Sequence, residues 1–298
     1  SLLWVSGMTP PLDAKVRALD LSGARLAGLS FPGVMLRDSD LSHADLGQAR
    51  LEGACLVRAR LEETRARNAS LDGADLQHAV LIGADLHRAS LRGVSLEGAR
   101  LTRVDLGYAA LEGAHAGGAW IHGCDLSGAR MERVDLSGAH LVECNLQEAR
   151  LDYANLKEAR LLRLDLRQTG MARVDLTEAA LTRCTLAHRD LREVQAYRLR
   201  VHRSDLSGVN LYGAALHRAS FHDCYLRRVC LRRADLRGVS LLRVRFGEAE
   251  DDRPAADLRH ADLRGANLLG TDLRDVDLRG ARLDDRLRTT ARRMGAWL

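Results

Sequence analysis

The segment LDGADLQHAVLIGADLHRASL, residues 71–91, contains the pattern that determines the fold of this chain. Leucine occupies every fifth residue of the segment, at Leu71, Leu76, Leu81, Leu86 and Leu91. The same phase continues without a break from Leu21 to Phe246, where all 46 such positions are apolar and 36 are leucine. A small residue, usually alanine, stands two places before most of them. A repeat of this kind decides the architecture before any other feature is considered.

A period of five residues fits neither an α-helix nor a β-strand. On a helix, each leucine would be displaced by about 140° from the previous one, so the leucines would spiral over the whole surface. On a strand, where side chains alternate, every second leucine would point away from the core. All the leucines are buried together if the chain bends after each short extended piece and winds into a coil. The sequence therefore predicts a solenoid whose interior holds the leucines and the small residues.

Two further positions of the repeat support a bend in every pentapeptide. Glycine often follows the leucine by two places, as at Gly73 and Gly93, and it accepts backbone angles that other residues avoid. Asp or Asn often precedes the leucine directly, as at Asp85 and Asn155. Its side chain can form a hydrogen bond with the local backbone at the corner of the coil.

The pattern Ala-(Asp/Asn)-Leu-x-x, as in Ala84-Asp85-Leu86 and Ala154-Asn155-Leu156, resembles the pentapeptide-repeat family over roughly residues 19–283. The resemblance implies an all-β fold, a right-handed quadrilateral β-helix with four pentapeptides per coil. Members of that family include DNA-mimicking proteins that protect or inhibit DNA gyrase, and secreted bacterial effectors. The resemblance therefore predicts the fold more strongly than the function.

Breaks in the repeat divide the chain into five predicted segments. Leu287, Ala291 and Met294 have helical spacing and predict a C-terminal capping helix, and Pro10-Pro11 predict a short helix in the N-terminal cap. The segments are an N-terminal cap or linker at 1–18, the β-helix at 19–249, an inserted loop at 250–255, a continuation of the β-helix at 256–283 and the capping helix at 284–298. Because the first residue is Ser1 rather than Met, we expect the chain to be a piece of a longer protein, and the family resemblance implies a bacterial, secretion-associated one.

Composition excludes several classes of protein. No apolar run reaches the length of about 18 residues that a membrane span needs, and no signal peptide is visible. The sequence predicts a cytoplasmic protein, with secretion by a route independent of a signal peptide as the open alternative. Four of the six cysteines, Cys124, Cys144, Cys184 and Cys224, occupy small interior positions and are interpreted as apolar fillers. Because no Cys-x-x-Cys pair, metal-ligand spacing or catalytic pattern occurs, we expect no metal, no cofactor and no enzyme activity.

One side of the predicted coil carries many arginines. Positions twenty residues apart stack above one another at about 4.8 Å along the axis, given four pentapeptides per coil. One such column contains Arg163, Arg183, Arg203 and Arg243 together with Asp223, and Arg160 and Arg200 lie beside it. Aligned like charges repel, so this is either a solvated face or a surface for an anionic partner. On the same face, Val80, Ile82 and Trp120 point outward, which indicates either a partner contact or incidental exposure.

A second column is acidic and contains Asp85, Asp105, Asp125 and Asp165. Aligned carboxylates resemble the phosphates of duplex DNA, which present one charge per about 1.7 Å of axis. The same residues are also the consensus of the repeat, where they brace the turn. A DNA mimic should be acidic overall, whereas this chain has a net charge of +5 and a pI of 9.1. Direct nucleic-acid binding is disfavoured because aromatic residues make up 4% of the chain and do not alternate with the arginines.

Three places weaken the repeat and predict a bend or an emerging loop. They are Thr64 to Asn68 around Ala66, Ala114 to Gly118, and His188 to Val201. In the last of these, Arg189 takes an interior small-residue position, where an uncompensated charge is costly, so we expect local distortion.

The sequence as a whole predicts a non-catalytic, rod-like scaffold that presents a rigid surface to a protein partner. The alternative is a DNA-mimicking regulator or protector of DNA gyrase or another topoisomerase. A homodimer formed through the terminal helix is a further expectation.

Overall fold

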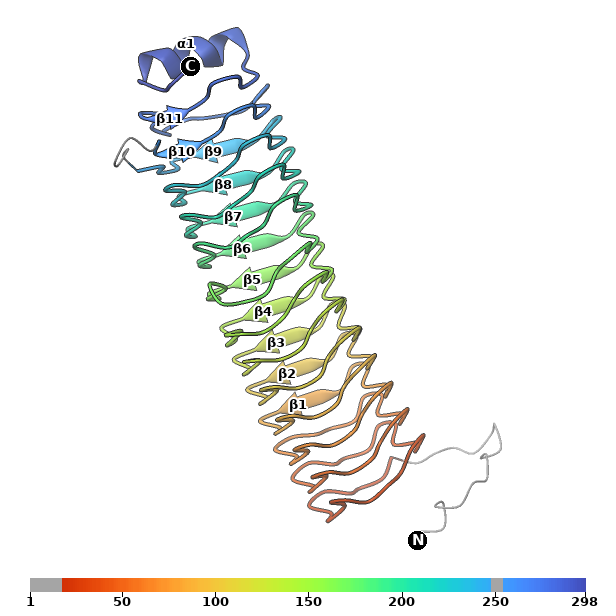
Figure 1. Ribbon diagram of the computed structural model, residues 1–298. Helices are drawn as coiled ribbons and strands as arrows, with labels where there is room; N and C mark the ends of the chain where they lie inside the picture. The colour runs from red at the N-terminus through yellow and green to blue at the C-terminus, as the bar shows by residue number, and fades with distance from the viewer. Residues whose placement is uncertain (1–17, 248–253) are drawn as a thin grey trace.

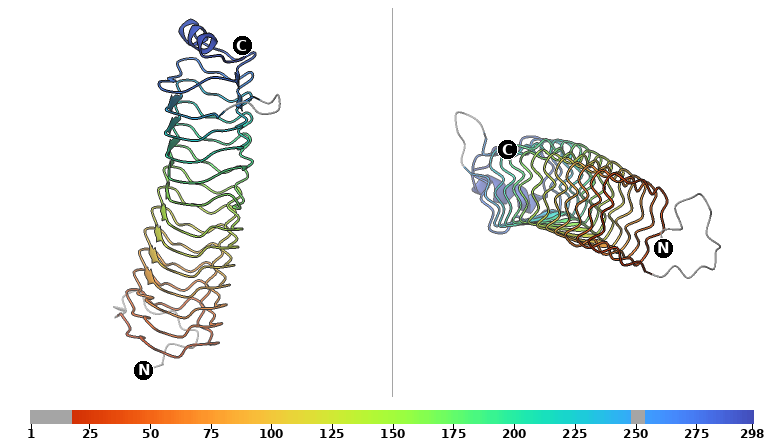
Figure 2. Two further views of the ribbon diagram at one scale, coloured as in Figure 1. Left: turned by 90° about the vertical axis from the view of Figure 1, so that its left-hand side faces the viewer. Right: turned by 90° about the horizontal axis from the view of Figure 1, so that it is seen from below.

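The computed structural model describes residues 18–247 and 254–298 and shows one long parallel β-solenoid with a helix over its C-terminal end (Figure 1). The family's β-helix is confirmed by the register, in which each residue pairs with the residue twenty places later, as Leu81 does with Leu101. Nine strands stack along one side of the rod (Figure 2). They are β1 (Val80–Ile82), β2 (Arg100–Thr102), β3 (Trp120–His122), β4 (His140–Val142), β5 (Arg160–Leu162), β6 (Ala180–Thr182), β7 (Arg200–His202), β8 (Ser220–His222) and β9 (Ser240–Leu242).

The local geometry of the repeat follows from its sequence. The leucine carbonyl accepts a hydrogen bond from the backbone N–H three residues later, as between Leu106 and Ala109 at 3.0 Å. The residue two places after the leucine has left-handed backbone angles, whether it is Gly93 (φ 60°) or Arg88 (φ 58°). The aspartate before the leucine accepts the N–H of the residue two places after it, as Asp105 does from Gly107 at 2.9 Å. The predicted turn and its carboxylate brace are therefore both present.

Between Leu36 and Leu263 the interior is largely aliphatic and enclosed, with Phe221 and Phe246 among the leucines. The leucines and the small residues two places before them are both buried, as Leu141 and Ala139 are at 0% exposure. The interior cysteines fill the small positions and also donate to backbone carbonyls of the preceding coil, as Cys144 Sγ does to Ile121 O at 3.4 Å. Burial raises the pKa of the Cys184 thiol to about 11, which keeps this thiol protonated at neutral pH.

Two of the three expected weak points do not interrupt the coil. The bridge pairs continue on both sides of Ala66 and Ala116, through Arg65 with Asp85 and through His115 with Asp135. The expectation of a bend or emerging loop at these two places is therefore wrong. A small residue in a leucine position is accommodated because the backbone turns that define the coil do not depend on its volume.

The third weak point is a real distortion. Within residues 18–247, the bridge pairs that would join Asn145 to Asp165 and Gly170 to Asp190 are missing, while their neighbours above and below are formed. Leu164 and Arg189 occupy small interior positions here, and a cleft of about 480 Å³ has Arg189, Asn145 and Asp165 in its lining. Arg189 Nη1 donates to the Thr169 carbonyl at 3.4 Å, whereas its Nε is buried and has no hydrogen-bond partner among the described residues. Each missing pair involves the residue directly after one of these bulky side chains, Asp165 after Leu164 and Asp190 after Arg189.

The C-terminal part resumes the coil after an insertion. Tyr225 pairs with Arg245, an offset of twenty residues, but Cys230 pairs with Asp257, an offset of 27. Strands β10 (Ala256–Asp257) and β11 (Val276–Asp277) belong to the resumed coil, and α1 (Asp285–Arg293) lies across its end (Figure 1). Ala291 of α1 is buried. The predicted N-terminal cap at 1–18, apart from Ala18, and residues 250–253 of the predicted loop lie outside the described residues.

The buried carboxylate of Asp277 provides a pH-dependent test of this end. Burial alone raises the pKa of Asp277, but hydrogen bonds from Arg279 outweigh burial, so its pKa lies below the ordinary value of 3.8. Its contribution to stability is therefore present above pH 3.8 and lost as the pH falls through the lowered pKa. Since Arg279 is 57% exposed, solvent screens the pair, and Asp277→Asn should cost about 1 kcal/mol or less at pH 7. Thermal unfolding should show a difference from wild type at pH 7 that shrinks at pH 3; a constant difference would contradict this assignment.

Candidate functional site: an arginine-bearing sheet face

The face formed by β1–β9 presents three outward columns of side chains. They lie one residue before, one residue after and two residues after the buried core residue of each strand. Register pairing aligns each column, so that Arg200 lies beside Ser220 and His202 lies beside His222. Because the backbone on either side is fixed by the solenoid, the spacing of these side chains is set by the fold.

The six predicted arginines are all exposed on this face, but they differ in their partners. Arg163 pairs with Glu143, and Arg243 makes two hydrogen bonds with Asp223, at 2.7 and 3.2 Å. Arg200 donates to the backbone carbonyl of Glu178 at 2.9 Å and forms no ion pair with a described residue, so its charge is uncompensated there. Arg160, Arg183 and Arg203 form no ion pair with any residue of the described chain. We call Arg160, Arg183, Arg200 and Arg203 the open arginine group; its members lie on or directly after β5–β7.

Several arginines on other sides of the solenoid are neutralised by aspartates, unlike this group. Arg167 and Asp165 form an ion pair at 2.6 Å, Arg192 and Asp190 one at 2.8 Å, and Arg237 and Asp235 one at 2.7 Å. Each of these aspartates directly precedes its core leucine and neutralises an arginine two residues later. The open arginine group lacks such an aspartate because the column before the core on this face contains Arg160, Ala180 and Arg200.

The structure does not bring the predicted apolar residues together into one patch. Val80 and Ile82 are half-buried on β1, while Trp120 lies two coils further along on β3 and is 42% exposed. Trp120 instead contacts His140 of the next coil, with ring centroids 5.0 Å apart. Burial, assisted by the nearby Arg160, lowers the pKa of His140 below 6.5. The tryptophan therefore extends the column that leads to the open arginine group.

The carboxylates of the acidic column mainly brace the backbone turns of the coil. Asp85, Asp105 and Asp125 are aligned by bridge pairs, and each accepts the backbone N–H two residues later. Arg67 contacts the Asp85 carboxylate, and Asn145 donates its side-chain amide to Asp125 at 3.0 Å. Asp165 is paired with Arg167 and is separated from the others by the missing bridge to Asn145. The column thus has three aligned carboxylates and then a break.

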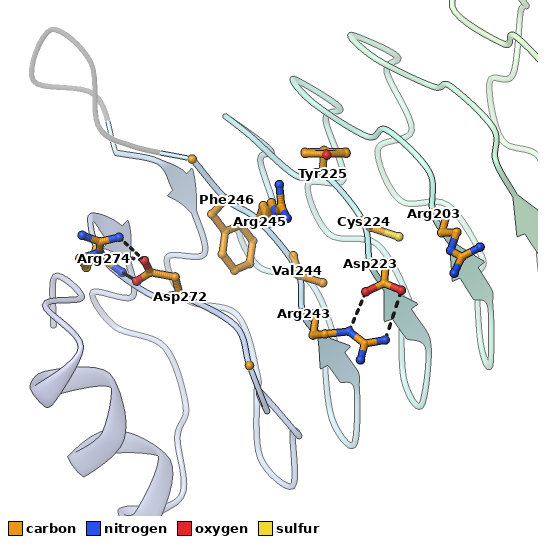
Figure 3. A pocket seen from close by; sticks show the side chains of 12 residues that line it. Arg203, Asp223, Cys224, Tyr225, Arg243, Val244, Arg245, Phe246, Asp272 and Arg274 are labelled. Carbon is orange, nitrogen blue, oxygen red and sulfur yellow. Dashed lines mark hydrogen bonds and ion pairs between the residues drawn. The ribbon is translucent and has the colours of Figure 1, made fainter.

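The C-terminal end of the arginine face adjoins a cleft that the sequence did not predict. Its volume is about 810 Å³, and Figure 3 shows Arg203, Asp223, Arg243, Arg245 and Arg274 among its lining side chains. Arg274 pairs with Asp272, and Arg245 lies over the ring of Tyr225 at 5.5 Å. The cleft lies next to the insertion, where the coil register changes from twenty to 27. Its position depends on that insertion, and periodicity alone could not predict it.

At the edge of this cleft lies a cluster that sequence analysis also missed. His202 and His222 lie on adjacent strands with their rings edge to face and the ring centroids 5.0 Å apart, and Asp223 follows His222. One ligand atom from each of these three residues lies within 4.8 Å of the others. The signal was present as two histidines twenty residues apart, but ligand searches in sequence look for short spacings. In a solenoid, residues that are one full coil apart in the sequence are also neighbours in space.

Comparison with known proteins identifies the class to which this solenoid belongs. The model of the pentapeptide repeats family matches residues 18–53, 54–93, 79–115, 129–168, 149–187, 203–241 and 255–285. The chain belongs to the pentapeptide-repeat family. Among curated proteins, no match is found.

Several solved structures of the same family are similar to this chain. HetL, a pentapeptide repeat protein involved in heterocyst differentiation regulation from the cyanobacterium Nostoc sp. strain PCC 7120, is 25% identical. Its match covers 83% of this chain and 90% of HetL, with a TM-score of 0.39. Full-length QnrB1, a plasmid-mediated fluoroquinolone resistance protein, is 17% identical, with 89% and 98% covered and a TM-score of 0.26. A protein of the Arabidopsis thaliana thylakoid lumen is 34% identical, with 39% and 70% covered and a TM-score of 0.16.

Across residues 18–247 and 254–298, the structure has no helix with the length and apolar character needed to span a membrane.

Proposed function

We propose that this protein is a non-catalytic, rod-like scaffold that binds an acidic protein surface through the open arginine group. The observation that carries the proposal is the stacking of Arg183 and Arg203, one coil apart and without carboxylate partners in the described chain. Aligned like charges are unfavourable by themselves, and an anionic partner relieves the repulsion. Guanidinium groups suit this role because their planar donors match carboxylates bidentately.

The rigidity of the scaffold supports the same role. The backbone N–H of each arginine is itself fixed by a coil-to-coil hydrogen bond, such as Arg200 N to Ala179 O at 2.9 Å and Arg203 N to His222 O at 3.0 Å. A surface of fixed spacing loses little conformational entropy on binding, which favours affinity. A contact between two copies through α1 stays a prediction, since the buried Ala291 shows one side of this helix packed on its own coil.

The test is affinity capture from a lysate of the source cells with the full chain and two charge-reversal variants. In the first variant, Arg183→Glu and Arg203→Glu invert the open arginine group. In the second, Arg133→Glu and Arg173→Glu make the same change at the same left-handed turn position on the opposite side of the coil. All four positions are exposed, so both variants should fold.

We expect the first variant to lose a protein that wild type and the second variant retain. The affinity should fall about tenfold or more, since like charges that face each other across an interface cost several kcal/mol. The wild-type interaction should also weaken with added salt. Equal retention by the two variants would refute the proposed surface.

The second candidate is regulation of a topoisomerase by DNA mimicry, favoured by the aligned carboxylates of Asp85, Asp105 and Asp125. If this candidate is right, a supercoiling assay should show that a near-stoichiometric amount of this protein inhibits DNA gyrase or protects it from a drug. That effect should then be lost when the three aspartates are replaced by asparagine, which keeps the turn-bracing hydrogen bonds.

A further inference from the structure

The cluster at the edge of the large cleft combines two imidazoles and a carboxylate. His202 and His222 occupy the same position on β7 and β8, so the register of the parallel sheet holds their rings side by side. Asp223 lies in the turn directly after β8, with left-handed backbone angles (φ 55°) that bring its carboxylate next to His222. Its Oδ2 is 3.5 Å from His222 Nε2. All three side chains are half-buried and therefore reachable from solvent.

Two of these three ligands, Asp223 and His222, already converge on a cation. The guanidinium of Arg243 binds Asp223 through its Nε at 2.7 Å and its Nη2 at 3.2 Å (Figure 3). The same Nη2 contacts Nε2 of His222. A ring nitrogen that faces an arginine N–H acts as an acceptor, so its lone pair is directed toward the position of the cation. The carboxylate and the imidazole are thus arranged around a positive centre, which in this structure is supplied by the chain itself.

We propose that His202, His222 and Asp223 form a binding site for a divalent transition-metal ion of the Zn²⁺ class, for which the ion and the Arg243 guanidinium compete. Two imidazole nitrogens and one carboxylate oxygen are a ligand set that Zn²⁺ accepts, with a fourth position open to water or to a partner. Ligand atoms within 4.8 Å of one another need small side-chain rotations to reach metal distances of about 2.0–2.2 Å. Arg243 can leave because its side chain is 64% exposed.

Exchange of the arginine for the ion is chemically balanced. Arg243 leaves the carboxylate with one positive charge and becomes hydrated, and the ion brings two positive charges to the same oxygen and to two neutral nitrogens.

The equivalent positions nearer the N-terminus carry fewer potential metal ligands. There, Arg163 pairs with Glu143 in the same column, and His122 lies 3.8 Å from that glutamate, but Val142 and Leu162 occupy the next two histidine positions. These positions serve as an internal control, because they contain one histidine in place of two.

The experiment is calorimetric titration of the untagged full chain with Zn²⁺, with Mg²⁺ as a negative control. Cys55→Ser and Cys230→Ser are introduced beforehand, because these half-buried thiols could bind zinc. We expect one zinc per chain and no heat with Mg²⁺, which prefers oxygen ligands. His202→Ala and His222→Ala should each weaken zinc binding by about tenfold or more, and Arg243→Gln should strengthen it because the competing cation is gone.

The matched control is Arg163→Gln, which frees Glu143 in the same way but leaves a single histidine nearby. It should leave the zinc affinity unchanged. Co²⁺ bound to the Arg243→Gln variant should give a visible absorption band that His222→Ala removes, which reports direct coordination. Zinc binding that is the same in wild type, His202→Ala and His222→Ala would overturn the proposal, as would an Arg243→Gln variant that binds zinc no better than Arg163→Gln.

Discussion

Replacement of Leu141 by aspartate is expected to unfold the coils around β4. Leu141 is 0% exposed and lies in the centre of the solenoid, between Ile121 and Leu161 of the adjoining strands. The substitution removes a buried side chain and leaves a carboxylate without a partner in an aliphatic interior, with an expected loss of about 5 kcal/mol or more. Since each coil contacts its two neighbours, a coil that unfolds separates the solenoid into two parts. Circular dichroism under denaturant titration should show an early transition that wild type lacks.

The control for this prediction is the neighbouring residue. Val142 lies on the same strand but points outward and is half-buried, so Val142→Asp should change stability by about 1 kcal/mol or less. The pair tests the predicted five-residue phase at single-residue resolution. Similar losses in both variants would contradict the assignment of Leu141 to the interior.

Replacement of Arg189 by alanine is expected to stabilise the protein by about 1–3 kcal/mol, the range associated with a buried unpaired polar group. In regular coils, a small residue's carbonyl accepts the backbone N–H 21 residues later, as Ala129 does from Arg150 at 2.9 Å. The equivalent carbonyl of Thr169 is instead bound by the Arg189 side chain, and Asp190 forms no bridge with Gly170 in the described chain. Alanine would release that carbonyl for the backbone of Asp190 and remove the buried, unpaired Nε.

The measurement is thermal unfolding, together with hydrogen exchange of the backbone amides of Asp190 and Met171. We expect a higher melting temperature and slower exchange for Arg189→Ala. Arg192→Ala is the control, since Arg192 is exposed and paired with Asp190, and it should lie within about 0.5 kcal/mol of wild type. A destabilised Arg189→Ala would show that the guanidinium supports this region, contrary to our interpretation.

The repeat made most of the fold predictable. Because the core position recurs every fifth residue and the coil closes after twenty, the place of Leu141, Cys144 or Arg183 in the cross-section follows from its number alone. The left-handed turn position was anticipated for glycine, yet residues such as Arg183 and Glu143 also adopt it, since the coil-to-coil hydrogen bonds impose it.

The candidate site was less predictable because it depends on side-chain partners. The column of Arg163, Arg183, Arg203 and Arg243 was predicted, but the column alone does not show which of them are neutralised. That depends on Glu143, one coil below Arg163, and on Asp223, one coil below Arg243. The distortion at Arg189 was expected. The involvement of Leu164 was not expected, because a leucine in a small-residue position does not stand out in a leucine-rich sequence.

The central claim, that the open arginine group is the binding surface, is tested most directly by hydrogen exchange of the full chain with and without its captured partner. We predict slower exchange on binding at the outward residues of β5–β7, around Arg160, Arg183, Arg200 and Arg203, with little change on the opposite side at Arg133 and Arg173. Protection centred on Asp85, Asp105 and Asp125, with β5–β7 unchanged, would contradict the claim and assign binding to the acidic column.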